Sequence, residues 1–453
     1  MSVIVTPLDW RDPCHVAGLF AHWPAMAFLD SALIHDDLGR YAFVTADPFA
    51  RFAIRDGIAE YDGRPLGGDP LDAMRQIMAP FAAPTIPDLP PFQGGAIGFF
   101  AYEFGMVLER HSFPDAEAPR FPHALFALYD WTIAFDRIAQ KCWLICTGHG
   151  PQPAHQRRDA ILSRLAEASR LAPRAPMRLD WRALSTQSDH EAAVARTIDY
   201  ILAGDIFQAN ITRRYSASVP RDFDPFAYYC QLRATNPAPF AAYLDFGDIT
   251  IASSSPERFI KVAKSHVETR PIKGTAHRAK DAREDGRRAD ALQHSIKDRA
   301  ENVMIVDLLR NDLSRVCEAG TVDVPVLCGV ESYASLHHLV SAVTGELSAD
   351  HDRFDLIRAV FPGGSITGAP KIRAMQIIAE LERHERGPYC GTIGYLGFDG
   401  TVDLNIAIRT VVFQGCEASF DVGGGITALS DPHAEYDETL LKAKRILAAS
   451  DQR

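Results

Sequence analysis

The segment Arg270–Thr275, with the sequence RPIKGT, strongly constrains the local backbone. Pro271 fixes its own φ and pushes the preceding residue towards an extended conformation, while Gly274 allows backbone geometry that a side chain would forbid. Lys273 is therefore expected on a stiff turn, after a predicted strand over Phe259–Thr269. A lysine held in this way can act as a nucleophile or base if it is desolvated or lies near other cations. The alternative is an ordinary solvated lysine in a turn.

The composition is that of a globular protein, with 47% hydrophobic and 23% charged residues in 453. This length allows two or three domains, or one large fold. A formal net charge of −11 argues against a nucleic-acid partner, because such proteins usually present a basic face. No apolar run approaches the roughly 20 residues that span a bilayer, and the N-terminus lacks the pattern of a secretory signal. We therefore expect a cytoplasmic protein with no membrane segment.

The eight cysteines are scattered along the chain, and none form a pair with two residues between them. The pattern therefore predicts neither a zinc site nor a thioredoxin-like dithiol. Reduced thiols are the expected state.

Pairs of carboxylates recur near the start of two predicted helices. Asp298 and Glu301 lie three residues apart in a helix predicted over 294–316, and Glu435 and Glu438 have the same spacing in the helix predicted near the C-terminus. Residues at this spacing share a helix face. Acids at such positions either complement the helix dipole or supply the oxygen ligands that Mg²⁺ prefers.

Two predicted strands could recognise an anion. In the strand predicted over Val402–Phe413, alternation places Arg409 opposite the aliphatic face, where it could bind a carboxylate or lie on the surface. The strand predicted over Ala418–Val422 runs into Gly423-Gly424-Gly425. The bare backbone of these glycines could donate amides to an anion or form a plain bulge.

The residues alone do not decide the role of two further segments. Glu257 follows a proline and could be a general acid or a surface partner of Arg258. The glycine-rich segment Gly363–Lys371 is not a phosphate loop of the Gly-Lys-Ser/Thr type, because Ala369-Pro370 intervenes before the lysine. Its open amides could still hold a carboxylate.

Taken together, these segments resemble the chorismate-utilising enzymes, which include anthranilate synthase component I, aminodeoxychorismate synthase component I, and the isochorismate and salicylate synthases. The matching motifs span about Asp189–Leu447 in the family's order. They are GDIFQ at 204–208, SPERF at 255–259, PIKGT at 271–275, VDLLRNDL at 306–313, HLVS at 338–341, the segment 363–371 and AEYDET at 434–439. The resemblance implies an α+β fold of layered β-sheets flanked by helices, like that of anthranilate synthase component I.

The same resemblance implies three regions in the chain. Residues 1–150 form an N-terminal region like that of anthranilate synthase component I, residues 151–188 form a linker, and residues 189–453 form the chorismate-binding catalytic domain. In this family the N-terminal part packs intimately on the catalytic part. Whether the linker is a true domain boundary is therefore left open.

Two positions indicate the branch of the family. The isochorismate and salicylate synthases carry a lysine base at the place of Gln208. With glutamine at this position, the chain resembles the ammonia-using branch of the family. Within that branch, anthranilate synthases carry alanine at the place of Lys273. The chain therefore resembles the aminodeoxychorismate synthase component I group, in which this lysine is the nucleophile.

The resemblance implies a Mg²⁺ ion that binds the ring carboxylate of chorismate. Glu301 and Glu438 would hold the ion directly, and Asp298 and Glu435 through water. Several relatives carry glutamate at the place of Asp298. In the implied reaction, Glu257 protonates the C4 hydroxyl as it leaves, neutral Lys273 attacks C2, and ammonia enters at C4 and displaces the lysine.

The resemblance also places a set of residues around the substrate. They are Gln208, Gly274, Thr275, His338, Ser365, Tyr395, Arg409, Gly423, Gly424 and Gly425. Tyr395, Arg409 and the glycine amides would hold its carboxylates. His338 matches an active-site histidine of the family, although it could equally be structural.

No glutaminase portion is visible, so we expect a partner glutaminase subunit, aminodeoxychorismate synthase component II, to supply ammonia. The implied product is 4-amino-4-deoxychorismate, a precursor of 4-aminobenzoate and folate. The alternatives are anthranilate synthase component I of tryptophan biosynthesis and a non-catalytic binding or regulatory homologue.

Overall fold

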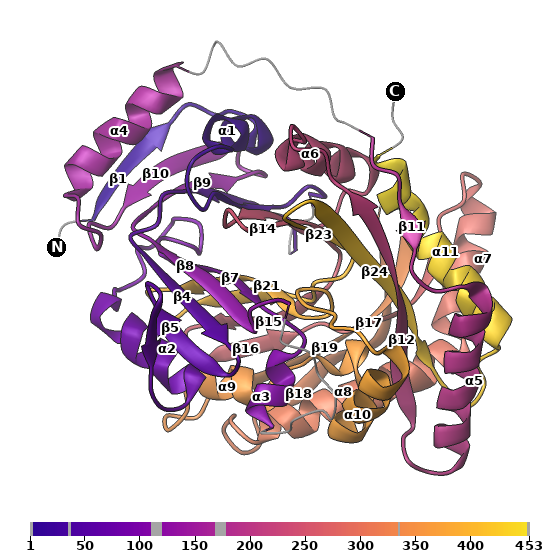
Figure 1. The fold of residues 1–453 in the computed structure, drawn as a ribbon. Helices are drawn as coiled ribbons and strands as arrows, with labels where there is room; N and C mark the ends of the chain where they lie inside the picture. Colours follow the sequence, from indigo (N-terminus) through magenta and orange to yellow (C-terminus); the bar gives the residue numbers. More distant parts are fainter. Residues whose placement is uncertain (1–2, 35–37, 110–119, 168–177, 334–335, 451–453) are drawn as a thin grey trace.

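The computed structural model describes residues 3–34, 38–109, 120–167, 178–333 and 336–450. Two large antiparallel β-sheets lie face to face, with helices on their outer sides (Figure 1). The α+β fold of layered sheets flanked by helices is therefore confirmed.

Sheet A contains strands from both ends of the chain. Its order is β1 (Ile4–Leu8), β10 (Lys141–Cys146), β9 (Trp131–Asp136), β3 (Tyr41–Thr45), β2 (Ala27–Asp30), β13 (Phe240–Asp245), β14 (Ile249–Ser255), β23 (Thr410–Gln414), β24 (Glu417–Ile426), β12 (Gln208–Ser218) and β11 (Arg182–Ala183), with β20 (Gly368–Ala369) paired to β12.

Sheet B is built in the same mixed way. Its order is β17 (Ile272–His277), β19 (Leu336–Glu346), β16 (His266–Thr269), β15 (Arg258–Ala263), β22 (Val402–Asn405), β21 (Thr392–Gly397), β7 (Gly95–Phe100), β8 (Ala124–Tyr129), β4 (Ala50–Arg55), β5 (Ile58–Tyr61) and β6 (Arg64–Leu66), with β18 (Asp323–Ser332) paired to β19.

The helices cover the sheets. They are α1 (Pro13–Phe20), α2 (Pro70–Met78), α3 (Phe104–Leu108), α4 (Ala154–Ala166), α5 (Gln187–Leu202), α6 (Pro225–Thr235), α7 (Ala282–Gln293), α8 (Ile296–Ser314), α9 (Arg353–Val360), α10 (Lys371–Glu382) and α11 (Pro432–Ala448), with short 3₁₀ turns η1 (Ala79–Phe81) and η3 (Gly364–Ile366).

The N-terminal and C-terminal regions share both sheets. In sheet A, β2 pairs with β13, and in sheet B, β7 pairs with β21. In each sheet the strands from before residue 151 form one side and the later strands form the other, and the two sides join at these pairs. The intimate packing implied by the resemblance is confirmed. Residues 168–177 of the predicted linker lie outside the described residues.

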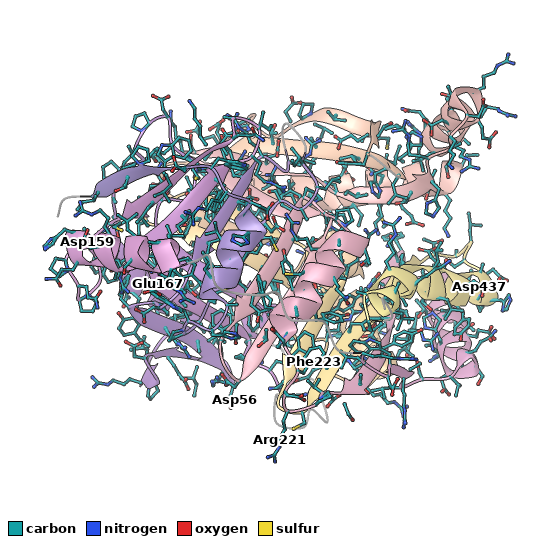
Figure 2. All side chains as sticks on the ribbon, turned by 90° about the horizontal axis from the view of Figure 1, so that it is seen from above. Asp56, Asp159, Glu167, Arg221, Phe223 and Asp437 are labelled. Atoms are coloured by element: carbon teal, nitrogen blue, oxygen red, sulfur yellow. The ribbon has the colours of Figure 1, made fainter. Side chains whose placement is uncertain are left out.

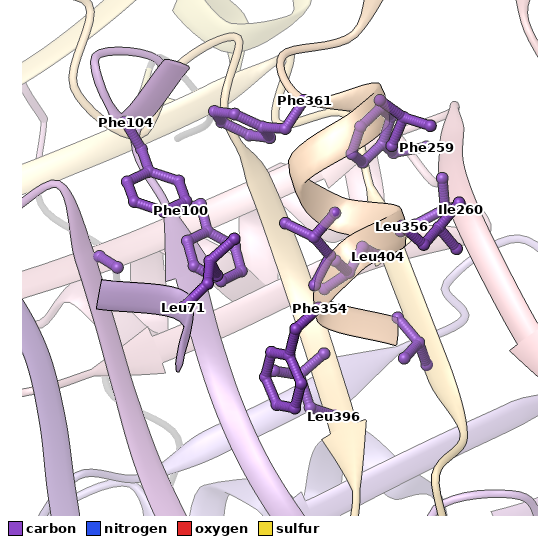
Figure 3. Packing of buried hydrophobic residues seen from close by; sticks show 14 of the residues in the cluster. Leu71, Phe100, Phe104, Phe259, Ile260, Phe354, Leu356, Phe361, Leu396 and Leu404 are labelled. Carbon is purple, nitrogen blue, oxygen red and sulfur yellow. The ribbon is translucent and has the colours of Figure 1, made fainter. Parts of the chain in front are cut away.

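Strand β8 shows how the layers pack, because both of its faces are buried. Ala124, Phe126 and Leu128 join the core on the outer side of sheet B, whereas Leu125, Ala127 and Tyr129 join the core between the two sheets. This is the period of two expected of a strand. Figure 3 shows part of the outer core, where aromatic side chains from β7, α3, β15 and α9 meet. A third core, on the outer side of sheet A, contains residues of α1, α4, α6 and α11.

Three segments predicted as single strands each form two. Leu125–Phe135 divides into β8 and β9, and Val402–Phe413 divides into β22 and β23, so that each segment crosses from sheet B to sheet A. Phe259–Thr269 is a hairpin of β15 and β16. The predictions were wrong because apolar alternation continues on both sides of each break.

The helices that carry the paired acids begin where the sequence predicts. The Ser295 side chain accepts a hydrogen bond from the Asp298 amide and caps α8, and the Asp431 side chain accepts one from the Ala434 amide and caps α11. Such caps satisfy amides that the first helical turn leaves open. They fix the first turns of α8 and α11, which carry the first acid of each pair, Asp298 and Glu435.

The outer surface carries many charged side chains, together with exposed apolar ones such as Phe207 and Leu429. Asp56, Asp159, Glu167 and Asp437 are exposed and lie at the periphery in Figure 2. Within the described part of the chain, no helix combines the length and apolar character needed to cross a bilayer.

Gly98 in β7 tests how tightly the strands of sheet B pack. A Cβ there would lie 2.0 Å from the Leu125 carbonyl oxygen of β8. Gly98→Ala should lower the free energy of unfolding by about 1–3 kcal/mol in chemical denaturation, because a rigid backbone would have to move. Gly67→Ala is the control, since nothing lies within 4 Å of the added Cβ. Equal stability of the two variants would contradict this packing.

Candidate active site

The four predicted metal ligands come together from α8 and α11. Glu301 interacts electrostatically with Asp298 on its own helix and with Glu435 on α11. A Cβ on Gly424 would lie 3.1 Å from a Glu435 carboxylate oxygen and 3.7 Å from one of Glu438. Two distant helices therefore bring their acids to the same place beside β24.

Two lysines accompany these acids. Lys297 lies 3.3 Å from Glu435, and the Lys442 ammonium lies 2.7 Å from Glu438. Burial would raise the pKa of Glu438, but Lys442 outweighs this effect and lowers it. Glu301 has no hydrogen-bond or ion-pair partner among the described residues, and burial raises its pKa. Among the described residues, the cluster thus contains two carboxylates without a direct side-chain partner, those of Asp298 and Glu301, and two that pair with amines, those of Glu435 and Glu438.

This donor set suits a hard cation. All four side chains offer carboxylate oxygens, which Mg²⁺ prefers to nitrogen or sulfur. No group of three or more His, Cys, Asp or Glu side chains in the described ranges already has the arrangement of a metal site. The two ammonium groups supply the positive charge that a cation would bring, so an ion could bind by replacing them. The residues therefore fit Mg²⁺ by chemistry, and its binding stays a prediction.

Lys273 lies beside this cluster on β17. Its Nζ donates a hydrogen bond to the Ser365 carbonyl oxygen at 3.0 Å, and the residue is half-buried. Burial lowers the pKa of the Lys273 amine, although the carboxylates of Glu301 and Glu257 act in the opposite direction. Gly274 has φ +80°, and a Cβ there would lie 2.8 Å from Asp298. The prediction of a turn was wrong: Lys273 lies within β17, whose pairing with β19 shifts register between Ile272 and Thr275, and this irregular strand presents the desolvated amine next to the acids.

Glu257 is connected to Lys273 through one residue. The Ser365 hydroxyl donates to a Glu257 carboxylate oxygen at 2.9 Å, and the Ile272 amide lies 3.4 Å from the same oxygen. Glu257 is 5% exposed, and burial raises the pKa of its carboxyl group, against the influence of Lys273 and Arg409. It is not the surface partner that its sequence context allowed. Burial thus favours a protonated acid beside a neutral amine.

Gln208 is fully buried on β12, and neither polar atom of its side-chain amide has a hydrogen-bond partner among the residues that the structure describes. A Cβ on Gly425 would lie 2.3 Å from the Gln208 Nε2 atom and 3.5 Å from Lys273 Nζ. Buried amides are nearly always paired, so an unpaired one beside a desolvated lysine has free capacity for a ligand.

The run Gly423-Gly424-Gly425 is a regular part of β24 and not a bulge. It pairs with Asn210, Ile211 and Thr212 of β12, whereas the pairing of β24 with β23 extends only to Phe420. The glycines therefore lie past the end of β23, where one edge of β24 has no strand beside it among the described residues. With Gly424 near the acids and Gly425 near Lys273, the run lies between the two halves of the site.

His338 and Arg409 line a small pocket with apolar walls. The Thr275 hydroxyl lies 2.9 Å from His338 Nδ1, and burial together with Arg409 lowers the pKa of His338 to about 4. Burial and Arg445 lower the pKa of Arg409 to about 10. Neutral His338 and cationic Arg409 thus offer a hydrogen-bonding group and a positive charge to a ligand.

The prediction that placed Arg409 on a strand face was wrong. Arg409 lies in the connection between β22 and β23, with φ 53°. The chain leaves one sheet there and enters the other, which turns the side chain into the pocket and away from any strand surface.

The structure does not bring Tyr395 to this site. Its ring packs 5.9 Å from that of Phe43 and 5.0 Å from that of Phe92, in the core between the sheets. Burial and nearby Asp403 raise the pKa of its hydroxyl well above the usual value. The other predicted residues gather around Lys273, Ser365 and the pocket.

The residues that sequence reasoning missed are basic. Lys297 and Lys442 neutralise the acids, and Arg445 lines the pocket beside Arg409. The spacing of four residues between Glu438 and Lys442 was a usable signal, since such pairs share a helix face. Lys371, at the end of the glycine-rich segment, pairs instead with Asp312 at 2.9 Å and has a structural role.

The chain is similar to known proteins over most of its length. The sequence matches the family described as chorismate binding enzyme over residues 32–448. Aminodeoxychorismate synthase component 1 of Salmonella typhimurium is 39% identical, covering 99% of this chain and 98% of the relative. Anthranilate synthase component 1 of Thermus thermophilus is 38% identical, covering 97% and 96%.

Solved structures share the fold. Anthranilate synthase component I of Streptococcus pneumoniae superposes with a TM-score of 0.80 at 32% identity, covering 92% of this chain and 94% of that chain. The menaquinone-specific isochorismate synthase of Escherichia coli superposes with a TM-score of 0.75 at 18% identity, covering 98% of this chain and 94% of that chain. At this low identity the similarity shows the fold alone.

The electrostatics of Lys273 can be tested by titration. Reductive methylation with ¹³C-formaldehyde should give a Lys273 resonance that titrates below the ordinary lysine value of about 10.4, because burial disfavours the charged amine. Glu301→Gln should lower the midpoint further by removing a nearby negative charge. Lys273→Arg identifies the resonance. A midpoint at or above the ordinary value would contradict the desolvated amine.

Proposed function

The chain belongs to the chorismate binding enzyme family, and on that premise we propose that it is an aminodeoxychorismate synthase component I. It would convert chorismate and ammonia to 4-amino-4-deoxychorismate, for 4-aminobenzoate and folate biosynthesis. The relatives named for this activity and those named for anthranilate synthesis have nearly equal identity to the chain. Overall similarity therefore does not choose between them, and the proposal rests on the site.

The observation that carries the proposal is the environment of Lys273. Its amine is desolvated, adjoins Gln208 across Gly425, and shares Ser365 with the buried acid Glu257. By the sequence resemblance, anthranilate synthases carry alanine at the position of Lys273, so anthranilate formation does not require a nucleophilic lysine there. Burial shifts the amine towards its neutral form and the acid towards its protonated form, and both shifts support covalent catalysis.

The side chains support a division of labour between acid and nucleophile. Glu257 would donate its proton to the C4 hydroxyl as that group leaves as water, while the free pair of Lys273 Nζ forms a bond to C2. Ammonia would then bond to C4 and release the lysine. Ser365 contacts both groups, so it would hold acid and amine in register. Arg409 would attract a substrate carboxylate.

The acids of α8 and α11 would hold Mg²⁺, with Glu301 and Glu438 in direct contact and Asp298 and Glu435 through water. When bound, the ion would supply positive charge that binds and orients the ring carboxylate. The chain's own part is to hold these acids together through the ion pairs of Glu435 with Lys297 and of Glu438 with Lys442, which the ion would replace.

We further propose that ammonia comes from a separate glutaminase subunit, as the "component 1" in the relatives' names supports. Gln208, whose buried amide has no partner, would lie on the path by which ammonia reaches the ring.

Product analysis tests the proposal. The purified chain with chorismate, Mg²⁺ and ammonium should form 4-amino-4-deoxychorismate, and Lys273→Ala should reduce this at least about 100-fold because the nucleophile is removed. Glutamine in place of ammonium should give almost no turnover. Lys264→Ala, a lysine on the β15–β16 turn, is the control. Fluorescent anthranilate as the main product, or full activity of Lys273→Ala, would reject the assignment.

The lysines of the acid cluster provide a test of the cation site. Lys442→Met should increase the affinity for Mn²⁺, measured by electron paramagnetic resonance, about two- to five-fold, because it frees the Glu438 carboxylate from its ion pair. Chelation of divalent ions should abolish turnover. Lys444→Met, on the same helix, makes the same charge change away from the cluster. An equal gain in both variants would show a general charge effect and no displaced ion pair.

A further inference from the structure

Two of the eight cysteines meet in the folded chain, although 216 residues separate them in sequence. Cys14 lies on α1 and Cys230 on α6, and their sulfur atoms are 3.5 Å apart. A disulfide has a sulfur–sulfur bond of about 2.05 Å. The two thiols are thus in contact and need only a small side-chain adjustment to form a bond.

The other cysteines lack this arrangement. Five are buried, and the sixth, Cys416, is exposed; no sulfur–sulfur contact other than that of Cys14 and Cys230 is found within the described residues. The five buried ones are Cys142, Cys146, Cys317, Cys328 and Cys390. Cys14 and Cys230 are half-buried, so a small oxidant can approach them.

The surroundings make the two sulfurs unequal. The two thiols share one hydrogen bond, in which either sulfur could donate. This bond and the Arg233 guanidinium lower the pKa of Cys230 in spite of burial. The shared hydrogen bond and burial raise the pKa of Cys14. Arg233 follows Cys230 by one helical turn and is fixed by an ion pair with buried Asp30. Cys230 is therefore the better nucleophile, because the thiolate is the reactive form.

We propose that Cys14 and Cys230 form a redox-modification site, a dithiol that a hydroperoxide converts to a disulfide joining α1 to α6. The Cys230 thiolate attacks one oxygen of hydrogen peroxide, which gives a sulfenic acid and releases hydroxide. The Cys14 sulfur then attacks the Cys230 sulfur; its proton and the leaving hydroxyl group depart as water. Two electrons pass from the thiols to the peroxide, and a thiol reductant reverses the change.

The bond would connect two separate parts of the outer layer of sheet A. Helix α1 packs on β3 and helix α6 on β14, so the disulfide links the N-terminal region to the catalytic region. It would also close a loop of more than 200 residues. A cross-link across such a loop restricts the unfolded chain strongly.

Peptide mapping of the full chain tests this proposal. After treatment with hydrogen peroxide and alkylation of free thiols, wild-type protein should yield a Cys14–Cys230 linked peptide, two mass units lighter than the sum of the two reduced peptides. Two of the eight thiols should become unreactive in denaturant, and dithiothreitol should restore them. The oxidised protein should unfold about 2–5 °C higher than the reduced protein.

Single variants test the order of the steps. Cys14→Ser should leave a sulfenic acid on Cys230 that dimedone traps, whereas Cys230→Ser should leave Cys14 largely unmodified. Cys416→Ser is the control and should form the same linked peptide as wild type. Absence of the linked peptide from peroxide-treated wild-type protein, with both thiols still alkylated, would overturn the proposal. Because the mapping is done on wild-type protein, it does not depend on the variants' folding or on turnover of chorismate.

Discussion

Desolvation of ionisable groups is the interaction on which this site depends. Lys273 and Glu257 are held where water cannot solvate their charges fully, so burial moves the pKa of the amine down and that of the acid up. Both shifts favour the uncharged forms of the two groups, in which the acid carries a proton and the amine a free electron pair. The acids nearby limit the effect on the amine, since Glu301 favours its charged form. The site is thus a balance between burial and the charges that surround it.

The fold maintains this balance by drawing the site from distant segments. Lys273 comes from β17 at one edge of sheet B, Gln208 and the glycine run come from sheet A, and the acids come from α8 and α11. Ser365 joins them from the turn between α9 and α10. Because each group is attached to a packed sheet or a capped helix, none can move far without disturbing a core. A site assembled in this way is rigid although its elements are spread along the chain from β12 to α11.

The sequence predicts the parts of the site that local spacing determines. The acids of α8 and α11 are found because a spacing of three places them on one helix face. Lys273 is found because proline and glycine mark its segment, although that segment is a strand and not a turn. Arg409 was misplaced, since alternation over Val402–Phe413 continues through a change of sheet that no local pattern marks. Tyr395 was assigned to the substrate site by resemblance, but its side chain packs in the core between the two sheets. The contact of Cys14 with Cys230 depends on tertiary packing alone, so spacing rules could not find it.

The sharing of strands also affects how the chain matures during synthesis. The partner of strand β2, β13, lies some 210 residues later in the chain, and the separation between β7 and its partner β21 is greater still. At about 5–20 residues per second, the ribosome needs roughly 10–40 s to supply the first of these partners. During that interval the nascent N-terminal region has incomplete sheets with unpaired edges, which invite association with other chains. Neither sheet can close until most of the polypeptide has emerged, so this enzyme matures as one late, cooperative event.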